Sequence, residues 1–257
     1  MSKIQRIDST KNEVIKWVAK LQAKSKQRYE EKLFVVEGFR QLLEVEASSL
    51  HSVFACKEED LANYDMVPRY KVSEDAMKTM SSEVTPQGIL AVVKMPKLDF
   101  VENDLHAKGL YLILENLQDP GNLGTILRVC DAVKVDAVIM SRNCVDLFNP
   151  KVVKATMGSL WHLPIVVAHE LEPIIQKMNE KNISVYGAYL TDSKEMYEFD
   201  YQEGTCFVIG NEGKGISNEL IQVCKERVRI PMPGRSESLN ASIATSVLLY
   251  EALRQRR

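Results

Sequence analysis

Residues 110–128 read LYLILENLQDPGNLGTILR, and this stretch predicts a buried β-strand followed by a helix. The five consecutive apolar residues at 110–114 are typical of a strand that is covered on both faces, as in a parallel sheet. The turn DPGN at 119–122 then predicts the start of a helix that carries Arg128, and Asn122 is a residue type that caps helix N-termini. The stretch therefore predicts one strand, loop and helix unit.

The same alternation continues to the C-terminus. Further apolar runs, each followed by a helical pattern or a loop, predict strands at 136–140, 164–168, 183–190, 206–210 and 228–231. We therefore expect an α/β fold whose C-terminal domain, residues 108–257, contains a parallel sheet covered by helices. Ligands of such sheets bind beyond the carboxyl ends of the strands, so the loops there are the candidate sites.

The N-terminal part predicts a smaller α/β unit. Apolar runs at 33–38, 52–56 and 89–93 alternate with helical patterns. Thr10 with Glu13 has the spacing of a capping box before the first helix, whose predicted apolar face is formed by Val14, Ile15, Trp17, Val18 and Leu21. Residues 95–109, MPKLDFVENDLHAKG, are polar and aperiodic and contain a proline. We therefore place an N-terminal domain at 1–95 and a linker at 96–107.

Composition indicates a globular protein, because 45% of the residues are hydrophobic and 26% are charged. The five cysteines are scattered singly, a pattern that predicts neither a zinc site nor a disulfide framework. No apolar run approaches the ~20 residues of a membrane span, and the first residues lack the apolar core of a signal peptide. We expect a cytoplasmic protein without a metal and without membrane contact.

Positive charge is concentrated near the N-terminus, where residues 1–40 hold ten Lys or Arg and five Asp or Glu. Lys24, Lys26 and Arg28 lie in a short basic stretch that suits contacts with RNA phosphates. A solvated helix face would have the same composition, and charge alone favours that simpler interpretation.

Two loops of the C-terminal domain carry polar groups in suggestive positions. Asn122 and Arg128 lie within two turns of one helix start, so both can face one site. In the loop GNEGKG at 210–215, Gly210 and Gly215 permit close approach of a ligand to the backbone, and Glu212 adds a carboxylate. This loop matches neither a Walker A motif nor the GxGxxG of dinucleotide folds, so a dehydrogenase has weak support.

A third loop, IPMPGRSESLN at 230–240, joins a predicted strand to the last helix. Ser238 and Asn240 are either helix caps or a pair of hydrogen-bonding groups for a ligand, and local spacing does not decide between the two. Small residues in the last helix, at about 239–254, would permit close packing in a core, in a dimer seam, or in both.

In combination these loops resemble one family. The order N-x5-R at 122–128, GNEGKG at 210–215 and IPM-x6-LN at 230–240 resembles the SpoU-TrmH branch of the SPOUT methyltransferases. Residues 1–95, with KQRYEEKLFVVEGFR and TPQGILAVV, resemble the ribosomal-protein-like substrate-binding domain that is often attached to that family. The resemblance implies an RNA ribose 2′-O-methyltransferase that uses S-adenosylmethionine, with a deep trefoil knot in its C-terminal domain and a homodimer whose active sites lie at the subunit interface.

The resemblance also implies roles for individual residues. Residues that would hold the methyl donor by backbone and apolar contacts are Gly210, Gly215, Ile230, Met232 and Leu239. Arg128 would position the ribose hydroxyl and a phosphate; base catalysis by Arg128 is left open, because a guanidinium stays protonated far above neutral pH. Side chains that would orient Arg128 and the substrate are Asn122, Glu212, Ser238 and Asn240.

Ribosomal RNA is the expected substrate, because the attached N-terminal domain resembles those of ribosomal RNA enzymes. Transfer RNA is the alternative substrate. A non-catalytic RNA-binding homologue is a further interpretation, but such a protein would be expected to have lost Arg128 or the IPM and SLN segments, and all three are present.

Overall fold

The computed structural model describes residues 3–98 and 105–257, so residues 99–104 of the expected linker lie outside the described part. The chain divides into two compact units. An N-terminal unit contains residues 1–97 and 146–161, and a C-terminal unit contains residues 98–145 and 162–257. The segment 146–161, which the sequence assigned to the C-terminal domain, therefore packs within the N-terminal unit.

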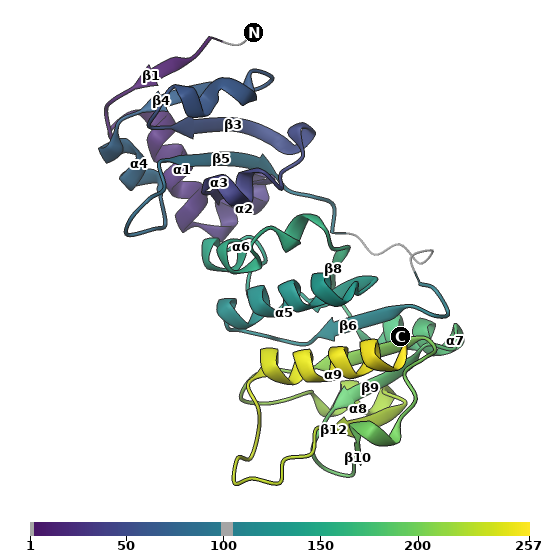
Figure 1. Ribbon diagram of the computed structural model, residues 1–257. Coiled ribbons are helices and arrows are strands. Elements are labelled where there is room, and N and C mark those ends of the chain that lie inside the picture. Colours follow the sequence, from purple (N-terminus) through teal and green to yellow (C-terminus); the bar gives the residue numbers. More distant parts are fainter. Residues whose placement is uncertain (1–2, 99–104) are drawn as a thin grey trace. The chain divides into compact units, whose positions relative to one another are not determined.

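A mixed five-stranded sheet forms the centre of the N-terminal unit, in the order β1-β4-β3-β5-β2 (Figure 1). β3 is parallel to β4 and antiparallel to β5, which also pairs with β2 in antiparallel fashion. The strands are β1 (Gln5–Ile7), β2 (Leu33–Glu37), β3 (Leu50–Ala55), β4 (Arg69–Val72) and β5 (Ile89–Lys94). The helices of this unit are α1 (Glu13–Ala23), α2 (Ser25–Glu31), α3 (Phe39–Leu42), α4 (Glu74–Met80) and α6 (Pro150–Thr156).

Helix α1 follows the predicted apolar spacing but begins differently. Ile15, Val18 and Leu21 are buried in the core of the N-terminal unit against strand residues, as their spacing predicts. The capping box predicted for Thr10 and Glu13 is wrong. Asn12 is the N-cap instead, and its side chain accepts a hydrogen bond from the amide N of Val14 at 2.8 Å.

The C-terminal unit contains the predicted parallel sheet, with seven strands in the order β10-β12-β9-β11-β6-β7-β8. All its strand pairs are parallel. The strands are β6 (Leu110–Leu114), β7 (Ala137–Ser141), β8 (Ile165–Ala168), β9 (Ser184–Ala188), β10 (Lys194–Glu195), β11 (Thr205–Ile209) and β12 (Glu226–Arg229). The helices are α5 (Pro120–Val133), α7 (Glu172–Glu180), α8 (Asn218–Val223) and α9 (Ala241–Gln255).

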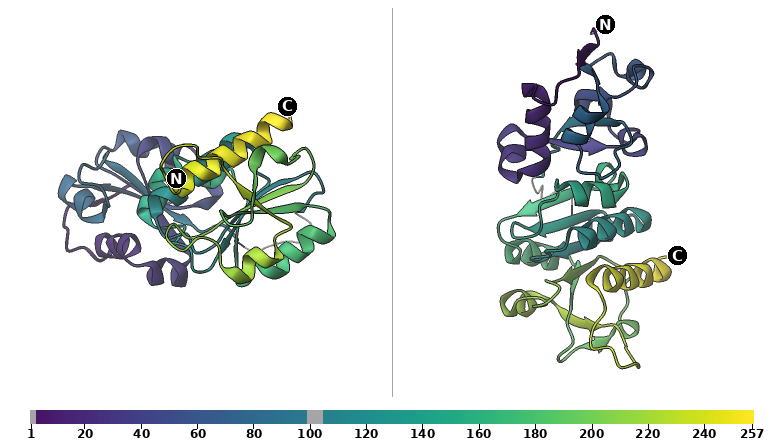
Figure 2. Two further views of the ribbon diagram at one scale, coloured as in Figure 1. Left: turned by 90° about the horizontal axis from the view of Figure 1, so that it is seen from below. Right: turned by 90° about the vertical axis from the view of Figure 1, so that its left-hand side faces the viewer.

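Helices cover both faces of this sheet, which explains why its strands are apolar without interruption. Tyr111 and Ile113 of β6 pack in one cluster with residues of α7 and α8. Leu112 and Leu114, which point to the other face, are also fully buried. On that face α5 and α9 pack against each other (Figure 2).

β6 lies between β11 and β7 in the sheet, so the loop after β6 and the loop after β11 are neighbours at the carboxyl edge. This edge is where open parallel sheets bind ligands. None of the helices in the described ranges is long and apolar enough to cross a membrane.

Candidate active site

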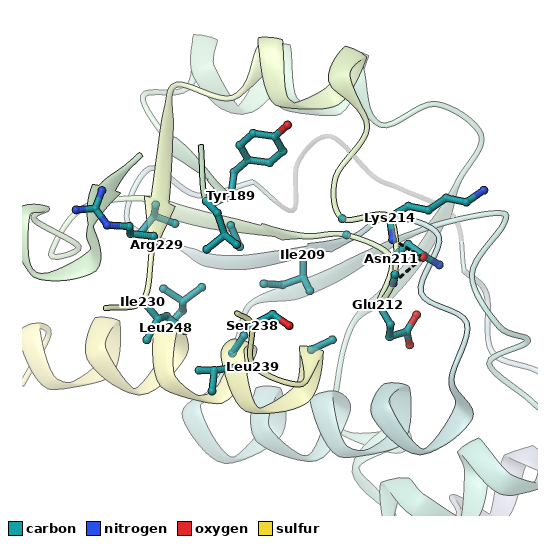
Figure 3. Close-up of a pocket in the computed structure, with 18 of the residues that line it drawn as sticks. Tyr189, Ile209, Asn211, Glu212, Lys214, Arg229, Ile230, Ser238, Leu239 and Leu248 are labelled. Atoms are coloured by element: carbon teal, nitrogen blue, oxygen red, sulfur yellow. Dashed lines mark hydrogen bonds between the residues drawn. The ribbon is translucent and has the colours of Figure 1, made fainter. Parts of the chain in front are cut away.

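A cavity of about 430 Å³ lies at the carboxyl ends of β9, β11 and β12 and the start of α9 (Figure 3). All five residues expected to hold a methyl donor line it: Gly210, Gly215, Ile230, Met232 and Leu239. Aliphatic side chains of Ile209, Val228 and Leu248 complete an apolar lining. We refer to this cavity as the donor pocket.

The sequence prediction missed one wall of the donor pocket. Ala188, Tyr189, Leu190 and Thr191 line it from the end of β9. The rule that ligands bind beyond the carboxyl ends of strands could have identified this segment, because β9 was predicted as a strand. What the sequence did not reveal is that β9 lies directly between β11 and β12.

The loop after β11 is folded tightly on itself. The backbones of Asn211 and Gly215 exchange hydrogen bonds of 3.0 and 2.9 Å, and the Asn211 Oδ1 accepts hydrogen bonds from the amide N of Gly213 and of Lys214 at 3.0 Å each (Figure 3). A Cβ at Gly210 would lie 2.2 Å from the Gly215 backbone. Gly215 has a φ of +70°. Both glycines are therefore required for this loop.

Asn211 also ties this loop to the loop after β6. Its Nδ2 donates a hydrogen bond of 2.9 Å to the carbonyl of Asn116. The backbone N of Asn116, which has a φ of 55°, donates in turn to Ser141 Oγ at the end of β7. Asn211 was not among the predicted site residues, although it stands within the GNEGKG motif.

Glu212 fixes the turn that precedes α5. Its carboxylate accepts hydrogen bonds from the backbone N of Gln118 (3.1 Å), the backbone N of Asp119 (2.9 Å) and Nδ2 of Asn122 (3.1 Å). Partial burial opposes ionisation of this carboxyl, but the donated hydrogen bonds outweigh it and lower the pKa of Glu212. Glu212 is therefore an ionised clamp.

Asn122 links this clamp to the last helix. Its Nδ2 donates to Glu212, and its Oδ1 accepts a hydrogen bond of 2.9 Å from Nδ2 of Asn240. The Oδ1 of Asn240 caps α9, accepting from the backbone N of Ser242 at 2.9 Å. The chain Glu212, Asn122, Asn240 thus joins all three predicted loops, and Asn240 is both a helix cap and a member of the site.

We expected Asn122 to cap α5, but it does not. Asp119 is the N-cap, and its side chain accepts a hydrogen bond of 2.7 Å from the backbone N of Asn122. Pro120 occupies the first helical turn, where its fixed φ and missing N–H are tolerated. The Asn122 side chain is thereby free to bond Glu212 and Asn240.

Arg128 and Ser238 are not tied into this network. Arg128 is exposed on α5, does not line the donor pocket, and has no hydrogen-bond or ion-pair partner among the described residues. Ser238 lines the donor pocket, and its backbone carbonyl accepts a hydrogen bond of 2.8 Å from Ser236 Oγ. Both polar side chains are therefore available to a ligand.

The basic stretch near the N-terminus divides into exposed and buried residues. Lys24 and Lys26 are exposed. Arg28, which we expected to contact RNA phosphates, has a side chain only 4% exposed. Its guanidinium donates to the carbonyls of Leu21 and Gln22 and forms an ion pair with Asp146. Arg28 is a structural residue of the N-terminal unit, and its assignment to RNA contact was wrong.

Within the described ranges, no group of three or more His, Cys, Asp or Glu could hold a metal ion. The pocket chemistry fits S-adenosylmethionine instead. A cavity of this volume falls in the range of roughly 300–1,000 Å³ for small-molecule sites, and its glycine backbone and aliphatic walls suit the adenine ring and the aliphatic chain of this sulfonium compound.

Comparisons with known proteins agree with this geometry. Residues 109–250 match the SpoU rRNA Methylase family, and residues 12–91 match the MRM3-like substrate binding domain. The chain is 32% identical over 251 residues to the 23S rRNA (guanosine(2553)-2′-O)-methyltransferase RlmP of Bacillus subtilis (strain 168), covering 96% of this chain and 98% of that protein.

Two solved structures are similar over nearly the whole chain. The AdoMet-bound rRNA methyltransferase from Sinorhizobium meliloti has a TM-score of 0.88 at 28% identity, with 98% of each chain covered. The SpoU methyltransferase AviRb from Streptomyces viridochromogenes, in complex with the cofactor AdoMet, has a TM-score of 0.87 at 27% identity, with 96% of this chain and 98% of that chain covered.

Proposed function

The chain belongs to the SpoU rRNA methylase family, and we propose that it methylates a ribose 2′-hydroxyl of ribosomal RNA with S-adenosylmethionine as the methyl donor. The observation that carries this proposal is the hydrogen-bonded chain of Glu212, Asn122 and Asn240, which holds three loops around one donor-sized pocket. Ribosomal RNA is favoured over transfer RNA because the relatives from B. subtilis and S. meliloti, which match both units, are named for rRNA.

The residues of the donor pocket bind and orient the donor. Ile230, Leu239 and Leu248 offer apolar contacts, and the Gly210–Gly215 backbone allows close approach. When bound there, S-adenosylmethionine supplies an electrophilic methyl group. The network behind Asn240 keeps the start of α9 in place, so that the pocket does not have to be formed during the reaction.

Transfer requires the ribose oxygen to lie in line behind the methyl group. A bond from the ribose oxygen to the methyl carbon would form as the bond from that carbon to sulfur breaks; S-adenosylhomocysteine would be the leaving group, and the hydroxyl proton would pass to water. Glu212 does not suit the role of base, because its carboxylate already accepts three hydrogen bonds and its pKa is lowered. Arg128 has no partner in the described chain, so we assign to it the positioning of the hydroxyl and a neighbouring phosphate.

We include a homodimer in this proposal. Helix α9 begins at the donor pocket, yet Ile243 and Tyr250 on it are 52% and 53% exposed. Arg128, on the neighbouring α5, lies outside the pocket of its own chain. A second copy packed on this face would cover the apolar side chains and bring two sites to the interface. The trefoil knot implied by the resemblance belongs to the same proposal.

Two further parts of the proposal concern the contact with RNA and the location of the protein in the cell. Lys24 and Lys26 are exposed, so we propose that they contact RNA phosphates without choosing the methylated nucleotide. All five cysteines are free, and we propose a reducing cytoplasm, where ribosomal RNA is modified, as the site of action.

Methyl transfer from radiolabelled S-adenosylmethionine tests the proposal. Purified protein is incubated with ribosomal RNA, or with transfer RNA, from cells that lack the gene, and the labelled nucleosides are identified after digestion. We expect 2′-O-methylated nucleoside from ribosomal RNA. Label in transfer RNA alone would establish the alternative substrate, and donor binding without transfer to either RNA would indicate a non-catalytic homologue.

A further inference from the structure

A second cavity, of about 550 Å³, lies wholly within the N-terminal unit. The start of α3, the segment after β3, the first turns of α4 and residues 84–88 line it. We call it the N-terminal cavity. Its volume falls in the range of roughly 300–1,000 Å³ for small-molecule sites, so it is large enough for one nucleobase.

Apolar side chains stand exposed at this cavity. Val84 is 99% exposed and Phe39 is 43% exposed, and both line it. Apolar side chains that line a cavity offer apolar contact to a ligand there. A planar ligand suits Phe39 best, because every nucleobase has a face that stacks on an aromatic ring.

A side-chain amide with free hydrogen-bonding capacity lies beside them. Gln87 lines the cavity and has no hydrogen-bond partner among the described residues. Its amide lies against Gly38, where a Cβ would stand 2.9 Å from both Nε2 and Oε1 of Gln87. Gly38 has a φ of +91°, a backbone conformation that favours glycine. The exposed Gln87 amide can offer a donor and an acceptor to the edge of a base.

The charges at the N-terminal cavity are of both signs, because Lys57 and Lys78 line it together with two carboxylates. Asp60 and Glu74 line it, and their negative charges act on the Cys56 thiol, whose pKa is raised chiefly by burial and further by these carboxylates. Carboxylates accept hydrogen bonds from the exocyclic amino groups of bases. Lys78 also lines the cavity and has no ion-pair partner within the described ranges, so a phosphate can be held there.

We propose that the N-terminal cavity binds one unpaired, amino-bearing nucleobase of the RNA substrate, stacked on Phe39, with its backbone phosphate at Lys78. This inference rests on the proposed function, since it names a binding site for the same RNA. Cytosine, adenine and guanine carry amino groups, whereas uracil carries none, so the cavity discriminates against uracil.

RNA binding by the full chain tests the proposal with ribosomal RNA as the probe, in a filter-binding assay. The variants are Val84→Ser and Lys78→Ala, which change exposed side chains that do not support the fold, and Phe39→Ala. Leu43→Ser and Lys11→Ala are matched controls, because both residues are exposed and neither lines the cavity. We expect Phe39→Ala to weaken binding on the order of tenfold and the two controls to bind like wild type.

A second experiment tests the choice of base. Hexamers of cytidine and of uridine compete with ribosomal RNA for the wild-type chain and for the double variant Asp60→Asn, Glu74→Gln. We expect the cytidine hexamer to compete roughly fivefold better with wild type and this preference to fall in the double variant. Equal competition by both hexamers would overturn the base assignment.

Failure of this inference differs from failure of the proposed function. If wild type methylates ribosomal RNA but all three cavity variants bind it with unchanged affinity, the N-terminal cavity is not an RNA site. If wild type neither binds S-adenosylmethionine nor transfers methyl groups, the proposed function fails. Circular dichroism and thermal unfolding of each variant, compared with wild type, check that the N-terminal unit is folded.

Discussion

The side-chain amide of Asn240 donates a hydrogen bond of 2.9 Å to the amide oxygen of Asn122, and so connects the starts of α9 and α5 across 118 positions of sequence. Asn122 can accept this bond only because its own amide N points to Glu212. The ionised carboxylate of Glu212 therefore sets the orientation of both amides. Because Ala241 and Ala244 of α9 line the donor pocket, these hydrogen bonds hold one of its walls.

Replacing Asn240 by aspartate removes its hydrogen bond to Asn122 and keeps the N-cap of α9. The new carboxylate would still accept hydrogen bonds from the first turn of α9, since aspartate caps as well as asparagine. It cannot donate to Asn122, so two acceptors would face each other. Leaving such a group unsatisfied costs about 1–3 kcal/mol, so we expect Asn240→Asp to weaken S-adenosylmethionine binding about tenfold or more, measured by calorimetry.

Asn149→Asp is the matched control for that change. Asn149 caps α6 through a hydrogen bond of 2.9 Å from the backbone N of Lys151, and it does not line the donor pocket. We expect the Asn149→Asp variant to bind S-adenosylmethionine as tightly as wild type does. Equal donor affinity in Asn240→Asp and wild type would show that the link to Asn122 does not shape the pocket.

Glu212 predicts a dependence of stability on pH. Its folded pKa is lowered from 4.5, so folding is favoured by its ionisation. This stabilisation is fully present above pH 4.5 and is lost as the pH falls through the lowered folded pKa. We expect the difference in free energy of unfolding between wild type and Glu212→Gln, measured in urea, to be constant near neutral pH and to shrink in acid. A difference that stays the same at every pH would show that ionisation of Glu212 does not stabilise the fold.

Gly210→Ala tests the tight loop after β11. The new Cβ would lie 2.2 Å from the Gly215 backbone, which cannot yield as a flexible side chain can. We expect a loss of donor binding with the rest of the fold intact by circular dichroism. Gly213→Ala is the control, because a Cβ there lies 3.7 Å from the nearest heavy atom, an ordinary contact. Similar donor affinities in the two variants would show that the loop tolerates the displacement.

Arg28→Ala should destabilise the N-terminal unit. The change leaves Asp146 without its ion-pair partner at a mostly buried position, and breaking such a pair typically costs about 3–5 kcal/mol. Lys26→Ala serves as the control, because Lys26 is exposed and its ion pair with Glu30 is weak. Thermal unfolding of both variants gives the comparison. A melting temperature of Arg28→Ala close to that of Lys26→Ala would contradict the assigned structural role.

The sequence predicted the features that depend on local patterns. Spacing placed Ile15, Val18 and Leu21 on the buried face of α1, and uninterrupted apolar runs predicted a parallel sheet covered on both faces. The five residues that the resemblance assigned to the methyl donor line one cavity, because its motifs mark loops at strand ends; their binding of the donor stays a prediction.

Features that depend on distant partners escaped prediction. Arg28 looked like a surface cation, because its partner Asp146 lies 118 positions away. The wall after β9 was missed because strand order cannot be read from apolar runs. Asn122 looked like a cap, and only the contacts with Glu212 and Asn240 show what its side chain does instead.

Arg128 is the residue on which turnover should depend most. It is exposed on α5, has no partner among the described residues, and follows Asn122 on the same helix. A guanidinium in such a place can hold a hydroxyl and a phosphate together through its planar set of donors. Losing one polar contact of the transition state typically costs ~10²-fold or more in rate. We therefore expect Arg128→Ala to lose at least that much in single-turnover methylation at saturating RNA.

Arg128→Lys separates the effect of the arginine's hydrogen-bonding geometry from the effect of its positive charge. Lysine keeps the positive charge but not the planar fork, so we expect it to lose most of the activity as well. Neither change removes a contact within the described chain, so folding and donor binding should survive both, as checked by thermal unfolding and calorimetry. Full activity in the lysine variant would show that a point charge near the phosphate is sufficient. Arg128→Ala with a wild-type single-turnover rate would show that Arg128 is a surface residue without a part in methyl transfer.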